Sequence, residues 1–387
     1  MSNINISPPV IYYHSVAPEP LPDWCLNWLT LPLRFFEDQL AYLQYHNYST
    51  IYLDEWLKYH AGEKKLNKKA VCITFDDGLL DNWVYVFPLA QKYNIHFTLF
   101  IAPECVDPRE IVRPTLEDVW NGECNMAALD TRGFVSWQEL KIMQESGYVD
   151  VQSHTMTHEK YVASDHIKSF YYGGANGVYT IWNNHPGIKP FYMSDPAFAK
   201  RIHFGTPLFE EKSAVIVNKH HINTNFLLDI QNLCVDFDLE HRPEQVAYEL
   251  RAKEIIHAYK TSNQLIQSIE RDYEYKNRLY YEIIGSKTVL EDRLKKPVQF
   301  LCWPHGDNNA ETHEIARTAG YLATTSGKLK NEAHKPDRIP RIGAGQVRNN
   351  VWLSRQKFNY QISKHLKKQP YYMISLANDF KNKLLHK

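Results

Sequence analysis

Apolar and polar positions alternate along most of the chain in patterns that predict strands and helices in turn. The apolar runs 70–75 (AVCITF) and 95–102 (IHFTLFIA) have the length and composition of buried strands. The segment 33–47 (LRFFEDQLAYLQYHN) instead repeats apolar residues three and four positions apart, as expected for a helix with one buried face. Further along, Ser136 and Glu139 have the spacing of a helix N-terminal capping box.

The order of these elements predicts an α/β fold. Strands that alternate with helices are typical of parallel sheets with helical crossovers, so we expect a distorted, closed or nearly closed (β/α) barrel. An open doubly wound sheet is the alternative. The chain has no GxGxxG after its first predicted strand and no GxxxxGK[ST], so neither common nucleotide-phosphate loop is predicted.

The barrel pattern is interrupted, which divides the chain into four predicted parts. Residues 160–285 are too long for a crossover; they read as an insertion, first an irregular aromatic lobe and then helices, with Leu265, Ile269 and Tyr273 on one helical stripe. The insertion could form part of the site or serve only as a structural lid or dimer contact. The other parts are 1–159 and 286–345, the two portions of the barrel, and 346–387, a helical tail.

Composition narrows the classes of partner. Lysine plus arginine and aspartate plus glutamate each number 44, and a formal net charge of zero argues against a nucleic-acid groove. The first residues resemble no signal peptide, and there is no run of about 18 apolar residues, so we expect a cytoplasmic protein without a membrane span. Contact with a membrane surface stays open, and no oligomeric state is predicted. The six scattered cysteines read as free thiols.

Candidate chemistry follows two of the predicted strands. Asp76 and Asp77 directly follow the strand 70–75, and two adjacent carboxylates repel each other unless a positive charge lies nearby. His154 and His158 follow the strand 148–153, and a helical turn would bring both imidazoles to one face. In a parallel barrel the carboxyl ends of the strands share one side.

These residues together predict a catalytic metal site. Asp77, His154 and His158 would hold a divalent cation, with zinc as first choice and cobalt, nickel, iron or manganese as alternatives. The cation would let Asp76 ionise and accept a proton from water, while Gly78 would permit the sharp exit from the strand. A glycosidase pair is disfavoured, because its two carboxylates stand about 5 Å or more apart across the bond.

At this point the sequence resembles a known family. TFDDG (74–78) and SHTMTH (153–158) are similar to the first two motifs of the polysaccharide deacetylases, the carbohydrate esterase family 4 or NodB-like group. The resemblance covers about residues 8–160 and 286–345. It implies a distorted (β/α) barrel of about seven strands, with Asp76 as general base and with Asp77, His154 and His158 as metal ligands.

Two further stretches resemble one branch of that family. FLCWPHG (300–306) is similar to a YPYG-type third motif, which implies that the main-chain N–H of His305 helps to form the oxyanion hole. PPVIYYHSV (8–16) is similar to a first strand that carries the catalytic histidine, which implies His14 as general acid. His185 and His203 of the insertion are the alternatives. The arginine that begins the usual third motif is absent, and Arg341 is our candidate to pair with Asp76.

The resulting hypothesis is hydrolysis of an N-acetyl group on an amino sugar. Without a secretion signal, a lipid-linked or soluble precursor of a cell-surface polysaccharide fits better than mature cell wall. Another C–N hydrolase activity, a deformylase or a cyclic amidase, is the enzyme alternative. A non-catalytic sugar-binding protein is the alternative from a different class.

Overall fold

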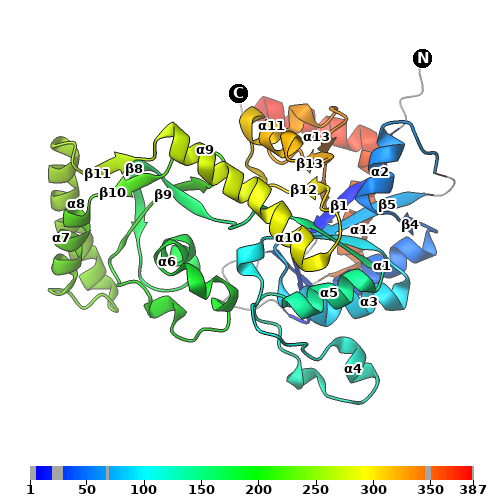
Figure 1. Ribbon diagram of the computed structural model, residues 1–387, viewed down its shortest axis with the longest axis horizontal. Helices are drawn as coiled ribbons and strands as arrows, with labels where there is room; N and C mark the ends of the chain where they lie inside the picture. Colours follow the sequence, from blue (N-terminus) through cyan, green and yellow to red (C-terminus); the bar gives the residue numbers. More distant parts are fainter. Residues whose placement is uncertain (1–5, 20–28, 67–68, 345–349, 386–387) are drawn as a thin grey trace.

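A curled sheet of parallel strands forms the centre of one lobe of the molecule (Figure 1). The computed structural model describes residues 6–19, 29–66, 69–344 and 350–385. Within that part of the chain, eight strands lie in the order β14-β13-β12-β7-β6-β5-β1-β15, and β4 pairs beside β5. Their bounds are β1 Val10–Tyr13, β4 Ser49–Thr50, β5 Ala70–Phe75, β6 Phe97–Ile101, β7 Val149–Ser153, β12 Phe300–Leu301, β13 Ala323–Thr325, β14 Arg338–Ile339 and β15 Ile342–Gly343.

The two edges of this sheet are joined by a single bent strand. β14 pairs with β13 at one edge, β15 pairs with β1 at the other, and only Pro340 and Arg341 separate β14 from β15. Consecutive Cα atoms are about 3.8 Å apart, so Ile339 and Ile342 lie within about 11 Å of each other. The sheet must therefore curl until its edges nearly meet. The predicted distorted (β/α) barrel is confirmed, with eight strands along the path where about seven were expected.

Helices cover the outside of the barrel, as strand-helix alternation requires. The helix predicted over 33–47 is observed, and the capping box is confirmed because Glu139 N donates to Ser136 Oγ (3.2 Å) and Ser136 N to Glu139 Oε2 (2.8 Å). The helices of this lobe are α1 Leu33–Tyr45, α2 Leu53–His60, α3 Phe87–Tyr93, α4 Leu116–Trp120, α5 Trp137–Glu145, α10 Ser286–Leu294 and α11 Ala310–Thr318.

The core explains why these runs become strands. All six residues of β5 and all five of β6 are buried, which is typical of parallel strands covered on both faces and which reads in sequence as a continuous apolar run. One large cluster of buried side chains joins β5, β6 and β7 to α1, α3 and α5. Burial of this kind supplies most of the free energy of folding.

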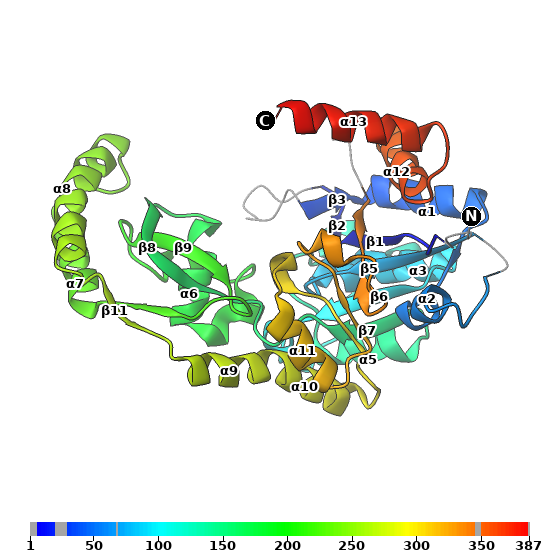
Figure 2. The same ribbon diagram turned by 90° about the horizontal axis from the view of Figure 1, so that it is seen from above.

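The inserted residues form a second lobe with sheets of its own (Figure 2). β8 and β9 pair antiparallel, as do β10 and β11. The predicted helical stripe through Leu265, Ile269 and Tyr273 is wrong, because 266–269 is a strand that satisfies its backbone by pairing with β10. The elements are β8 Lys160–Phe170, β9 Pro207–Ser213, β10 His220–Ile222, β11 Ile266–Ile269, α6 Val178–Asn184, α7 Thr224–Cys234, α8 Arg242–Thr261 and α9 Asp272–Tyr280.

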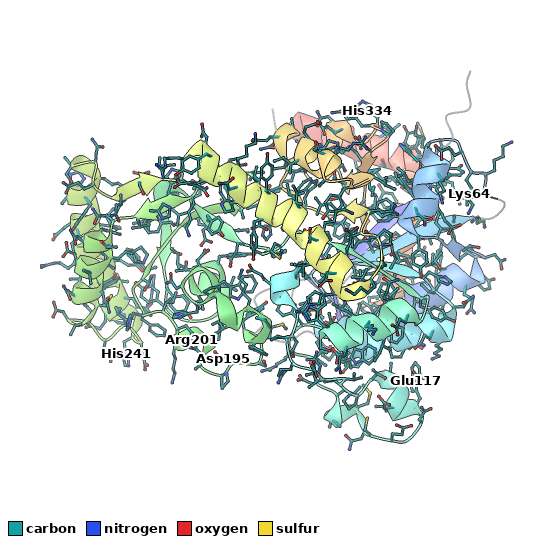
Figure 3. All side chains as sticks on the ribbon, in the orientation of Figure 1. Lys64, Glu117, Asp195, Arg201, His241 and His334 are labelled. Atoms are coloured by element: carbon teal, nitrogen blue, oxygen red, sulfur yellow. The ribbon has the colours of Figure 1, made fainter. Side chains whose placement is uncertain are left out.

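A continuous helix returns from this lobe to the barrel. α9 passes through a π-helical turn at Tyr281–Gly285 directly into α10, as the long diagonal helix of Figure 1 shows. The boundary expected at residue 285 lies inside this run, and the division into four parts stays a prediction. At the lower edge of the lobe, Figure 3 shows Asp195 beside Arg201, an ion pair 3.0 Å long.

The C-terminal tail is helical, as predicted. It forms α12 Val351–His365 and α13 Tyr371–Leu385, and α12 packs on α1, where Tyr42 donates to Asn359. β2 Ser15–Ala17 pairs with β3 Thr30–Pro32. Cys72, Cys105, Cys124, Cys234 and Cys302 are free, while Cys25 lies outside the described residues. No helix in the described ranges is long and apolar enough to span a bilayer.

Candidate active site

The two aspartates sit on a sharp turn at the carboxyl end of β5. Asp77 and Gly78 both have left-handed backbones, with φ of 75° and 70°. A Cβ on Gly78 would lie 2.4 Å from Ile101 Cδ1, so glycine is required both for its backbone freedom and for the close approach of β6. Because the chain turns here, Asp76 and Asp77 point to different partners, although they are adjacent in sequence.

Asp77 converges with both histidines. Its Oδ1 atom lies 3.2 Å from His154 Nε2 and 3.1 Å from His158 Nε2. The helical turn expected between the histidines is wrong: residues 154–159 form an irregular loop, in which Thr155 and His158 have φ of 61° and 54°. The loop nevertheless brings the imidazole centroids within 5.0 Å of each other. The three predicted ligands therefore meet, through a different local structure.

The donor set fits a divalent cation. Asp77 Oδ1 is buried and has no hydrogen-bond partner, which is costly for a carboxylate oxygen unless a cation satisfies it. Separations of 3.1 and 3.2 Å are close to the ~3.3 Å between two ligands of a tetrahedral zinc site with bonds of about 2 Å. His154 Nδ1 lies 2.9 Å from the Cys302 carbonyl oxygen, so it carries the proton and leaves Nε2 free to bind metal.

Asp76 is held by Arg341. Arg341 Nη1 donates to Asp76 Oδ1 (2.6 Å) and Nη2 donates to Oδ2 (2.8 Å), a bidentate pair buried at the bend between β14 and β15. Burial by itself would raise the pKa of Asp76, but the charge and hydrogen bonds of Arg341 lower it below the ordinary value. The carboxylate is therefore ionised and fixed in orientation. This is the pairing proposed from the sequence.

His14 follows β1 and faces the same carboxylate. Its Nε2 atom is 3.8 Å from Asp76 Oδ2, and its side chain keeps 18% of its surface exposed to the cavity side. Burial lowers the pKa of His14, whereas Asp77 and Asp76 act against that shift. The structure thus places His14 beside the candidate base, on the same side of the barrel as the metal ligands.

His305 lies at the rim of the metal site. Its backbone has φ of 59°, and its ring centroid is 4.6 Å from that of His158. Burial lowers the pKa of His305 well below the ordinary value, and the nearby His158 adds to the effect. The side chain is thus a neutral imidazole, packed against a candidate metal ligand.

All seven predicted site residues border one cavity of about 780 Å³ between the barrel and the inserted lobe. They are His14, Asp76, Asp77, His154, His158, His305 and Arg341. His185 and His203, the alternative acids, are not among the residues described as lining it. The roles of the seven remain predictions.

Sequence reasoning missed three contributors. Cys302 was expected only as one of the free thiols, yet its carbonyl orients His154 and its Sγ accepts from Arg341 Nη2 (3.0 Å). Tyr179 and Lys160 come from the inserted lobe, and Tyr179 Oη lies 3.4 Å from His305 Nε2. The only sequence signal for the last two was the density of aromatic residues in the insertion.

Comparisons with known proteins agree with this geometry. Residues 63–171 match the family model "Polysaccharide deacetylase". The chain is 21% identical over 374 residues to the poly-beta-1,6-N-acetyl-D-glucosamine N-deacetylase of Escherichia coli K12; the alignment covers 96% of this chain and 40% of that protein. This chain therefore spans about two fifths of the length of that relative.

Two solved structures show the same general similarity. The Streptococcus pyogenes deacetylase PplD has 14% identity and a TM-score of 0.49 over 92% of this chain and 98% of its own. The BpsB deacetylase domain from Bordetella bronchiseptica has 15% identity and a TM-score of 0.48 over 87% and 96%. The stretch matched by the family model contains Asp76, Asp77, His154 and His158. The comparisons therefore show that residues 63–171 are similar to the polysaccharide deacetylase family, and the four residues of that stretch border one cavity with His14, His305 and Arg341.

Proposed function

We propose that this chain is a metal-dependent hydrolase that removes the N-acetyl group from an amino sugar in a polysaccharide or in its lipid-linked or soluble precursor. The observation that carries the proposal is the cavity in which a three-ligand cation site, an ionised carboxylate and an imidazole meet. The relative that aligns over most of this chain is named as an N-deacetylase of a poly-N-acetylglucosamine, which favours the same reaction.

The cation would be held by Asp77, His154 and His158. When bound, it would polarise the acetamide carbonyl and favour deprotonation of the attacking water. Zinc suits two imidazoles and one carboxylate, and other first-row divalent ions suit them as well.

Asp76 is proposed as the general base. Arg341 keeps it ionised and fixes its orientation, so its oxygens can accept the proton of the attacking water. Arg341 occupies both oxygens in the plane of the carboxylate, and each oxygen retains a second lone pair for the water.

His14 is proposed as the general acid. The leaving amine of an amide is poor unless it is protonated, and an imidazole 3.8 Å from the base can donate that proton. The main-chain N–H of His305 is proposed to stabilise the developing oxyanion. The expected cytoplasmic location also stays a prediction, which fractionation of cells producing the full-length protein tests.

Amine release from a panel of N-acylated amino sugars tests the function. The panel should contain soluble and lipid-linked compounds and N-formyl as well as N-acetyl groups, with metal content measured in the same preparation. Asp76→Asn should keep the metal and the fold but lower kcat by about 10²- to 10⁴-fold, because only the base is removed. Near-normal turnover by that variant would assign the base to another residue.

His14 is tested by changing the leaving group. His14→Ala should retain metal and lower kcat strongly on acetamides, but much less on aryl acetates, because a phenolate leaves without protonation. Equal losses on both substrates would mean that His14 shapes the site and does not donate the proton.

A further inference from the structure

The wall of the cavity beyond the metal site is strongly basic. Lys160 and Lys168 enter it from β8 of the inserted lobe, and Lys328 and Lys330 enter it from the segment between β13 and β14 of the barrel. Burial lowers the pKa of Lys160, Glu211 and Asp307 act against that shift, and the charges of Lys168 and Lys328 add to it. All four lysines border the same cavity. We call these four residues the lysine wall.

Most of this positive charge is not neutralised by the protein. Within the described residues, no carboxylate oxygen lies within 4.0 Å of the ammonium groups of Lys160, Lys168 or Lys330, whereas Lys328 pairs with Asp307 at 2.6 Å. Glu211 also lines the cavity, but burial raises its pKa to about 7 against the opposing effect of Lys168 and Lys160. The wall thus keeps a net positive charge at neutral pH.

Lys160 connects the wall to the reacting atoms. Its Nζ lies 4.9 Å from the centroid of the Tyr179 ring, and Tyr179 Oη is 3.4 Å from His305 Nε2. The His305 ring contacts His158, a candidate metal ligand. The lysine wall is therefore linked to the candidate ligand His158 by three successive side-chain contacts, through an aromatic ring that can stack on a sugar.

We propose that the substrate is an N-acetylated sugar that carries an anionic group, a phosphate or a carboxylate, and that the lysine wall binds this group. The inference rests on the proposed deacetylase function and specifies its substrate class. Lys160 is half-buried and has no carboxylate partner, so it gains most from an anionic ligand, since the ligand supplies the missing charge. Lys168, Lys328 and Lys330 are exposed and add attraction from the rim of the cavity.

The lysine wall also disfavours a positively charged substrate. A partly deacetylated glucosamine polymer carries ammonium groups, and like charges at a binding surface cost affinity. The product amine would likewise be repelled, which favours its release. An acidic glycan, or a sugar attached through phosphate, keeps its negative charge after the acetyl group is removed. It therefore stays attracted to the lysine wall.

Three probes with the same acetamide test the proposal. Chitotetraose is neutral, a hyaluronan tetrasaccharide carries carboxylates, and UDP-N-acetylglucosamine carries phosphates. We expect kcat/KM to be about 10-fold or more higher for at least one anionic probe than for chitotetraose, since bonds to charged groups exceed those to neutral ones. Raising NaCl from about 50 to 500 mM should lower only the anionic rates. The preferred probe distinguishes phosphate from carboxylate.

A matched pair of variants isolates the wall. Lys160→Gln/Lys168→Gln/Lys330→Gln should lower kcat/KM for the preferred anionic probe about 10-fold or more relative to that for chitotetraose, so that the preference for the anionic probe is lost. Lys141→Gln/Lys253→Gln/Lys276→Gln removes the same charge from exposed helix positions outside the cavity and should leave the preference unchanged.

Binding separates this inference from the proposed function. Calorimetry on metal-loaded Asp76→Asn, with and without the three wall substitutions, measures affinity without turnover. The inference is supported if the anionic probes bind more tightly than chitotetraose and lose that advantage when the three wall lysines are substituted. This holds even if the wild type hydrolyses none of the probes. Such a failure of hydrolysis would overturn only the deacetylase proposal. Equal binding and equal rates for all three probes would overturn the inference and leave the deacetylase proposal standing.

Discussion

At the scale of single residues, Asp76 and Asp77 show how residues adjacent in sequence acquire different partners. Asp76 is buried and Asp77 is largely enclosed, and this loss of solvent would by itself raise the pKa of each. Arg341 lowers the pKa of Asp76, while His158 and His154 lower that of Asp77 well below its ordinary range. The left-handed backbone at Asp77 sends the two side chains to these different partners.

The amount of metal bound by each variant should distinguish the candidate ligands from the proposed base. Asp77→Ala, His154→Ala and His158→Ala should each lose most bound metal as well as activity, because two ligands rarely hold a catalytic cation. Elemental analysis after dialysis measures this, with Asp76→Asn as the variant that should keep its metal. One metal per chain in all three alanine variants would refute the assignment.

Arg341 should set the acid limb of the pH profile. Arg341→Met leaves Asp76 buried without its counter-charge, so the pKa of Asp76 rises and the acid limb of kcat/KM moves to higher pH. Arg341→Lys should shift it less, because lysine keeps the charge but not the two-bond fork. Arg355→Met, which breaks the surface pair with Asp38, is the control. An acid limb that stays in place in Arg341→Met would mean that another group sets it.

At the scale of elements, the loop 154–159 depends on the helix that returns from the inserted lobe. Glu282, in the π-helical turn between α9 and α10, accepts bonds from Met156 N (3.2 Å), Thr157 N (3.1 Å) and Thr157 Oγ1 (2.5 Å). Lys189, also from the lobe, lies 2.6 Å from Glu159 and from Glu104. These contacts hold a loop whose left-handed residues would otherwise relax.

Glu282 should therefore act as a positioning residue for the cation site. Glu282→Ala should weaken zinc affinity about 10-fold or more and lower the free energy of unfolding by about 1–3 kcal/mol, because two buried N–H groups lose their acceptor. Glu282→Gln should recover much of the affinity, since its amide oxygen can accept the same bonds. Competition with a chelator measures the affinity, and Glu254→Gln on the exposed face of α8 is the control. Full affinity in the alanine variant would contradict this role.

Some helices and strands could be predicted from the sequence pattern, and others could not. β5 was predicted residue for residue, because a strand buried on both faces has an unmistakable apolar run. β12, β14 and β15 have two residues each, too few for any period. The strand 266–269 was read as helix because residues four apart are apolar in either structure, and only its distant partner β10 decides between them.

At the scale of the whole molecule, the cavity belongs to both lobes. Tyr179 brings the lobe against His305 in the wall of the cavity. Tyr179→Ala should therefore raise KM several-fold and change kcat less, because substrate contact is lost while the reacting groups stay in place. Steady-state kinetics with the metal-loaded protein tests this. A loss confined to kcat would assign Tyr179 a role in the chemical step.

This shared cavity also marks the limit of prediction from sequence. The candidate metal ligands, the proposed base and its arginine could be brought together from the sequence because each follows a strand and parallel strands end on one side. Lys160 and Tyr179 could not be assigned to the site, since their placement depends on how two lobes pack, a property of surfaces and not of local periodicity. For the histidine pair, spacing predicted proximity correctly and the intervening helical turn wrongly.

The bent strand that closes the barrel links the order of synthesis to the completion of the proposed site. Asp76 leaves the ribosome early, whereas Arg341 comes only after the entire inserted lobe has been made. Until residues 338–343 arrive, β13 and β1 present open edges that can pair with other chains, and a carboxylate destined for burial lacks its counter-ion. A nascent chain is therefore vulnerable to misassembly until this strand docks, and Arg341, which pairs with the proposed base, is also the residue at which the sheet closes.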